Sequence, residues 1–300
     1  MRRHLIALAA PLVLLSGTSI LHAQAAPLAI ASSQLDINDG GMKDAETYFI
    51  PAVNLYISHH GGLFVANGKA SAKTKFVLDG LDNEYAQGLS RQIQEDLATK
   101  LRAAGLKVLL YEDMKADPEV VKRDRLEADK KLGIATKEGP GGAITYVLAT
   151  GTAEQAFKPA MQGPAWPFRG FAKDKKMMVL LPELWVDAPQ MLAEKSRGYK
   201  SSKASIDVEP GMLLRGFFVW TLMTKGGGWI KLKQPVWDLG TEVGTVTKEG
   251  EDRTDLGLGM KRAKGDYSLV LNKDAFTAST LRAGYAMNDA IVAAVVGARK

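Results

Sequence analysis

An apolar stripe between Asn83 and Ala104 constrains the fold of this chain more than any other feature. Gly105 stands directly after the stripe, where a left-handed cap would end a helix. The run "LKVLLYED" follows and predicts a short strand. We therefore expect an amphipathic helix that packs on a sheet. The apolar residues of the stripe recur every four positions, as helical spacing requires: Tyr85, Leu89, Ile93, Leu97 and Leu101.

Strand signals surround this helix on both sides. Before it, "FIPAVNLYIS" and "LFVA" flank the Gly61-Gly62 pair and predict strand, turn, strand, and "KTKFVL" (73–78) predicts a third strand. After it come "AITYVLATGTAE" and "MMVLLP", and β signals dominate the stretch 205–247, where Gly226-Gly227-Gly228 marks a turn. The strand "YSLVLN" precedes a final helix at about 274–298.

Two polar segments receive different predictions. Pro118 opens a charged stretch, Glu119 to Leu132, whose four-apart pairs of opposite charge favour an exposed helix. Residues 248–265 are polar and contain glycine, which favours a loop. Together the signals predict an α+β fold: a mixed β-sheet covered by helices, with a β-rich second half and a long C-terminal helix. We expect a polar lead-in over 26–47 and a single domain over 48–300.

The N-terminus has the pattern of a secretory signal peptide. Arg2 and Arg3 lead into an apolar run that ends at Ala23-Gln24-Ala25, an A-x-A cleavage site. Pro11 and the polar stretch after Leu15 interrupt the run, whereas a membrane anchor needs roughly 20 uninterrupted apolar residues. We expect residues 1–25 to be removed near Ala25 by a Sec-type route, and the mature chain to be periplasmic or secreted, with no transmembrane segment.

Composition excludes several kinds of chemistry. The chain has no cysteine, so it forms no disulfide and offers no thiolate ligand, cysteine nucleophile or lipidated N-terminal cysteine. Without Arg2 and Arg3 the 39 basic residues fall to 37 against 33 acidic residues, a net charge of +4. Basic and acidic residues alternate, as in "EVVKRDRLEADKK", whereas a nucleic-acid binder gathers its basic residues on one face. We expect no nucleic-acid partner.

The order of elements from the amphipathic helix to the closing helix is similar to the domain of the curli-secretion-channel family and its periplasmic relatives. The resemblance covers residues 75–155 and, more loosely, the closing helix, and it implies a fold and a compartment. Channel-forming members resemble lipoproteins, and this chain has no cysteine to acylate, which favours an assembly or secretion accessory module. The matching positions are Leu97, Leu101, Gly105, Val108, Asp113, Gly142, Ala143, Tyr146, Val147, Leu148, Gly151 and Thr152.

The adjacent pair His59 and His60 is the first place to look for catalysis or a metal. The other two histidines, His4 and His22, belong to the predicted signal peptide. Neighbouring side chains of a strand point to opposite faces, so the pair shares a metal only if the chain turns there. Zinc needs three or four protein ligands, and the remainder would have to be carboxylates. We predict a polar turn, no metal site and no cofactor.

Acidic clusters are the other candidates for chemistry. Carboxylates act as acid and base when their surroundings separate their pKa values, but helix N-termini attract acids as well, so we predict that Asp82 is a helix cap. "KGGGWIKLK" lacks the spacing of a phosphate-binding loop. No catalytic residue is assigned. The carboxylates considered are Asp79, Asp82, Glu84, Glu112 and Asp113.

The Pro-rich loop at 156–175 is the main candidate for an interaction site. Trp166, Phe168, Arg169 and Phe171 are residue types enriched at interface anchors. The alternative is that the aromatic side chains fold back as a lid over the core. We expect a non-catalytic envelope protein that binds an envelope protein or polymer, with a second copy of the chain as a further candidate partner. The rival expectation is a periplasmic hydrolase that uses paired carboxylates.

Overall fold

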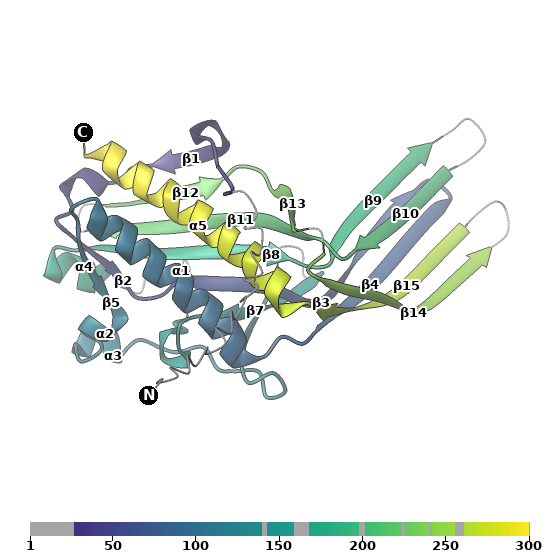
Figure 1. Ribbon diagram of the computed structural model, residues 1–300, viewed down its shortest axis with the longest axis horizontal. Coiled ribbons are helices and arrows are strands. Elements are labelled where there is room, and N and C mark those ends of the chain that lie inside the picture. The colour runs from purple at the N-terminus through teal and green to yellow at the C-terminus, as the bar shows by residue number, and fades with distance from the viewer. Residues whose placement is uncertain are drawn as a thin grey trace, which may run out of the picture.

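The computed structural model has an α/β body from which a long β arm projects (Figure 1). It describes residues 27–139, 143–158, 168–197, 202–223, 226–240, 242–255 and 261–299. The predicted signal peptide, 1–25, lies outside these residues. Among them, no helix is both long and apolar enough to cross a membrane.

The helices comprise two long elements, which lie side by side over the sheet in Figure 1, and three short ones. The long ones are α1 (Asn83–Ala103) and α5 (Lys273–Ala298), and the short ones are α2 (Tyr111–Met114), α3 (Pro118–Val121) and α4 (Arg169–Lys175). The strands are β1 (Leu35–Asn38), β2 (Thr47–Ile50), β3 (Asn54–Asn67), β4 (Ala70–Asp79), β5 (Lys107–Leu110), β6 (Ala135–Glu138), β7 (Ile144–Ala149), β8 (Met178–Asp187), β9 (Gln190–Arg197), β10 (Ser202–Glu209), β11 (Met212–Met223), β12 (Gly226–Leu232), β13 (Val236–Gly240), β14 (Gly244–Asp255) and β15 (Lys261–Leu271).

Thirteen of these strands form one mixed sheet, which confirms the predicted α+β class. Its main path runs β1, β12, β11, β8, β3, β4, β15, β14. The pairs β2–β5, β2–β8, β3–β8 and β4–β15 are parallel, and the other pairs are antiparallel. Strands β9 and β10 form a separate antiparallel hairpin.

The main core lies between the sheet and the two long helices. Four of the five residues of the predicted stripe of α1 are buried, and Tyr85 is half-buried. Asp82 accepts a hydrogen bond from the Tyr85 amide at 2.8 Å, which confirms the predicted cap. Helix α5 packs closely on α1, since a Cβ placed on Gly284 would lie 2.5 Å from Ile93 Cγ1. Asn288 fixes the same contact by donating to the Ile93 carbonyl at 2.8 Å.

A smaller core occupies part of the opposite sheet face, where α2, α3 and α4 lie at one end of the body. Phe168 and Phe171 are fully buried there. Phe49 contacts both rings, with centroid distances of 5.9 and 5.2 Å. These short helices therefore close the second face by packing aromatic side chains against the sheet.

The arm has two layers (Figure 1). The first consists of the far parts of β3, β4, β15 and β14, and the second is the β9–β10 hairpin, which packs over β3 and β4. A small apolar cluster holds the layers together, with Val65, Ala72 and Ile206 buried at its centre. Near the tip, Asn67 Nδ2 donates to the Ser196 carbonyl at 2.8 Å and ties β3 to β9.

Three local predictions are wrong. Gly61-Gly62 does not turn the chain, because β3 runs through to Asn67 with a β-bulge between Ser58 and His60 where it pairs with β7. The charged segment 119–132 is helical only as far as Val121. Residues 248–265 are not a loop: β14 and β15 pair over most of this range and build half of the arm.

Candidate binding groove

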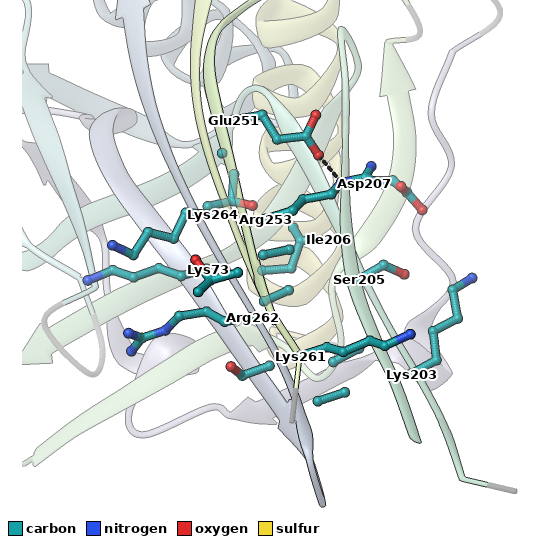
Figure 2. A pocket seen from close by; sticks show the side chains of 18 of the residues that line it. Lys73, Lys203, Ser205, Ile206, Asp207, Glu251, Arg253, Lys261, Arg262 and Lys264 are labelled. Atoms are coloured by element: carbon teal, nitrogen blue, oxygen red, sulfur yellow. Dashed lines mark hydrogen bonds and ion pairs between the residues drawn. The ribbon is translucent and has the colours of Figure 1, made fainter. Parts of the chain in front are cut away.

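A groove of about 710 Å³ runs along the arm beside β10 (Figure 2). Six consecutive residues of β10, Ser202 to Asp207, line it, and β9 contributes none. Successive side chains of a strand alternate between faces, so a cavity lined by all six follows the edge of the strand. The groove therefore lies on the side of β10 away from β9.

The edge of β10 that faces the groove has no strand partner among the described residues. Strand β10 pairs only with β9, through the full register from Ser202↔Arg197 to Glu209↔Gln190. Such an edge presents a row of unpaired backbone N–H and C=O groups, which can pair with another extended chain. In addition, the Ser205 hydroxyl oxygen is buried and has no hydrogen-bond partner in the described structure.

The floor of the groove is made of small residues. Ala70 and Ala72 on β4 and Ala263 and Gly265 on β15 line it, and the register pairs Ala263 with Ala72. The β9–β10 hairpin covers β3 and β4, whereas β15 and β14 extend beyond it at the side of the sheet. The small residues leave space at the height of a second layer, except over Gly265, where an added Cβ would lie 2.6 Å from Cε2 of the Tyr267 ring. The groove over Ala263 therefore has the shape of a place for one more strand beside β10.

The rim of the groove is charged. Glu251 on β14 accepts hydrogen bonds from Lys248 and Arg253, and these bonds hold its pKa below its ordinary value. Lys261, which extends toward β10 in Figure 2, is the register partner of Asp255 on β14 and forms no ion pair within 4.0 Å with a described residue. The rim therefore includes one cation that makes no direct ion pair with a carboxylate of the described residues.

The outer face of the same strands gathers further cations. Figure 2 shows Lys73, Arg262 and Lys264 extending together on the side away from β10. Lys264 and Lys73 are register partners, and Phe64, which is 60% exposed, pairs with Lys73 from the other side. Like charges directly opposite each other destabilise a sheet, and Asp252 at 4.0 Å from Lys264 offsets this only weakly.

The predicted interaction loop divides between two environments. Phe168 and Phe171 belong to the second core, as the lid alternative has it, and Arg169 is exposed. Trp166 lies outside the described residues. Two of the four predicted anchors are therefore unavailable to a partner in this structure, and an interface through the whole loop stays a prediction.

The two histidines come together because of the bulge in β3. His59 Nδ1 and His60 Nδ1 lie 2.9 Å apart, so the expectation that they point to opposite faces fails at this position. Burial, followed by the neighbouring His60, lowers the pKa of His59, while Asp79 and Asp129 act in the opposite direction. No group of three potential metal ligands exists among the described residues, so the pair has no third ligand there.

Three of the five carboxylates considered from sequence make local structural contacts. Asp82 caps α1 and binds Lys273 at 2.7 Å, and Asp113 accepts from the Leu110 amide at 2.8 Å. Glu112 binds Lys115 at 2.6 Å. None of these three contacts is a carboxylate pair.

Sequence reasoning missed two buried carboxylates on β8, Glu183 and Asp187. They are four residues apart on one strand, which separates them by roughly 13 Å. Paired carboxylates of glycoside hydrolases lie about 5 to 9.5 Å apart, so these two do not have that spacing.

No protein-family model matches the chain, and neither the curated proteins nor the solved structures include a match. The resemblance to the curli-secretion-channel family stays a prediction.

Proposed function

We propose that this protein is an exported, non-catalytic binding module of the cell envelope, and that its arm holds an extended segment of a partner protein beside β10. The observation that supports this most is the edge of β10, which has no strand partner in the part of the chain that the structure describes and which lies beside the small residue Ala263 of β15. An added strand would receive backbone hydrogen bonds from β10, as in other complexes formed by strand addition. Its side chains would point alternately toward the floor, over Ala263 and against the Tyr267 ring, and toward solvent.

The charges of the rim favour a segment with acidic side chains. Lys261 offers a cation without an ion-pair partner among the described residues, whereas Lys248 and Arg253 already share Glu251. An acidic side chain of the added strand would contact Lys261 without displacing an existing pair. Rim charges of this kind mainly set the association rate and the choice of partner.

Other features support the envelope as the place of action. The N-terminal pattern Arg2-Arg3, apolar run, Ala23-Gln24-Ala25 is that of an exported chain. The resemblance of residues 75–155 to a curli-assembly domain family points to the same compartment. An assembly or secretion accessory module would use a strand-accepting groove to hold a subunit in extended form.

Site-directed photocross-linking in intact cells tests the proposal. A photoreactive phenylalanine analogue at Ser205 lines the groove, and the matched control places it at Glu194, the register partner of Ser205 on β9. We expect an adduct from position 205 that maps to one acidic, extended segment of an envelope protein, and none from position 194. Equal adducts from both positions, or no adduct from 205, would contradict the proposal.

The rival expectation from sequence, a hydrolase with paired carboxylates, has its own test. Glu183→Gln and Asp187→Asn remove the two buried carboxylates of β8 one at a time. If either substitution abolished a hydrolytic activity of the purified protein while the fold stayed intact, the non-catalytic proposal would be wrong.

A further inference from the structure

A second cavity, of about 470 Å³, lies at the root of the arm, separate from the groove beside β10. Residues from β3, β4, β7, β8, β9, β11 and β13 line it. Its size falls within the range of small-molecule sites. Its wall is mainly apolar, with contributions from Leu63, Met191 and Leu213.

One arginine is fixed at the wall of this cavity. Arg215 is the extra residue of a bulge in β11, between Leu214 and Gly216, where pairing with β8 shifts register. Its Nη1 donates to Asp187 Oδ2 at 2.8 Å. A bulge aims its side chain away from the regular positions of a strand, which explains how Arg215 reaches the cavity.

The carboxylate that holds Arg215 is buried and hydrogen-bonded on both oxygens. Asp187 is 4% exposed, and its second oxygen accepts a hydrogen bond from the Tyr146 hydroxyl at 2.6 Å. Burial raises the pKa of Asp187, and the hydrogen bonds from Tyr146 and Arg215 oppose this effect. Each carboxylate oxygen already accepts one hydrogen bond, and through these two bonds Asp187 fixes the guanidinium beside Tyr146.

The guanidinium retains donors that face the cavity. The Arg215 side chain is 41% exposed, and within the described part of the chain its one hydrogen bond is the one to Asp187. A guanidinium has five N–H donors in a fixed fork, which suits carboxylate, sulfonate or phosphate oxygens. Trp237, whose exposed fraction is 48%, lines the same cavity and provides an aromatic surface.

The geometry points to a binding site for a small organic anion with an apolar or aromatic body, whose acidic group binds Arg215 and whose body packs against Trp237, Met191 and Leu213. A neutral alcohol of the same shape offers the guanidinium one uncharged acceptor, whereas the acid offers two oxygens that share a negative charge. The anion therefore binds more tightly than its neutral counterpart. This site is independent of the strand-binding groove.

Isothermal titration of the full mature protein with 4-phenylbutyrate and its neutral analogue 4-phenylbutan-1-ol tests this site. We expect the acid to bind about tenfold more tightly than the alcohol, because a hydrogen-bonded charge contributes on that scale. Arg215→Gln should weaken binding of the acid about tenfold and leave the alcohol unchanged, and Arg215→Lys should lie between. Trp237→Ala, at an exposed position that leaves the Asp187 network intact, should weaken both ligands.

The matched control is Arg262→Gln, which removes an arginine of the arm that does not line this cavity. It should bind the acid as the unmodified protein does. Equal affinity for acid and alcohol, unchanged binding of the acid by Arg215→Gln, or no binding of the acid at millimolar concentration would each overturn the inference.

Discussion

Replacement of Glu183 by glutamine should change how the stability of the fold depends on pH. Glu183 is 7% exposed on β8, and its Oε1 has no hydrogen-bond partner in the described structure. Burial raises its pKa from the ordinary value of 4.5 to about 7, against the opposing effects of Lys137 and of a hydrogen bond with Trp185. The folded chain therefore holds a proton on Glu183 over a pH range in which the unfolded chain has lost it.

The sign and the size of the effect follow from these two pKa values. Because the folded state binds more protons between pH 4.5 and 7, the free energy of unfolding falls as pH rises through this window. At 1.36 kcal/mol per pH unit, the loss is about 3 kcal/mol and is complete above pH 7. Glutamine resembles the protonated acid and does not ionise, so Glu183→Gln avoids this loss. The stability of Glu183→Gln minus that of the unmodified protein should therefore be about 3 kcal/mol larger at pH 8 than at pH 4.

Urea unfolding followed by tryptophan fluorescence at pH 4, 6 and 8 measures this difference. The matched control is Glu194→Gln, at a glutamate whose side chain is 61% exposed on β9. The control and the unmodified protein should show the same pH dependence. Parallel stability curves for Glu183→Gln and the unmodified protein would refute the argument that burial keeps Glu183 protonated.

Three further predictions follow from single contacts. In a thermal unfolding assay, Gly284→Ala should destabilise the protein by about 1 to 3 kcal/mol, because the new methyl group would meet Ile93. In the same assay Gly88→Ala should stabilise the protein by up to about 1 kcal/mol, because this glycine of α1 has open space around it. Ile206→Ala should loosen the packing of the β9–β10 hairpin on β3 and β4 and lower the stability of this contact by about 2 to 4 kcal/mol. Hydrogen exchange should then rise in β10 and stay unchanged in α1. The pKa of His59, measured by NMR, should lie below that of an ordinary histidine, and a normal pKa would contradict this prediction. Because a histidine with a lowered pKa destabilises the fold as the pH falls, His59→Gln should lose less stability in acid than the unmodified protein.

The body of the fold could be predicted from sequence because its elements bury one regular stripe. Helix α1 ends at Ala103, within one residue of the predicted Ala104, and α5 spans Lys273–Ala298 against a predicted 274–298. Both helices face the same core, so their apolar positions recur with helical spacing.

The arm could not be predicted in the same way. The segment "TKEGEDRTD" of β14 has exposed or half-exposed residues on both faces, so it lacks the alternation of a half-buried strand. Its structure comes from its pairing with β15, which follows later in the sequence. One signal was present: in "ASAKTKF" small or apolar residues alternate with polar ones, and the small residues Ala70 and Ala72 form the groove floor.

The errors at β3 have a related cause. The Gly61-Gly62 pair satisfies the pattern of a turn, but a Cβ placed on Gly62 would lie 2.1 Å from the Thr74 carbonyl oxygen of β4. The glycines therefore permit close strand packing beside a bulge, and the same bulge brings His59 to His60. From sequence alone, a pair of glycines that permits a turn cannot be distinguished from one that permits two strand backbones to approach each other closely.

Hydrogen exchange of the β10 amides tests the central claim most directly. The segment mapped by cross-linking at position 205 would be added to the purified protein as a synthetic peptide, with a scrambled peptide of equal charge as control. Strand addition predicts that the peptide slows exchange at alternate amides between Ser202 and Asp207 and leaves β9 unchanged, because only alternate amides of β10 face the groove. Unchanged exchange in β10, or protection confined to β9 or to the outer edge of β14, would contradict the account.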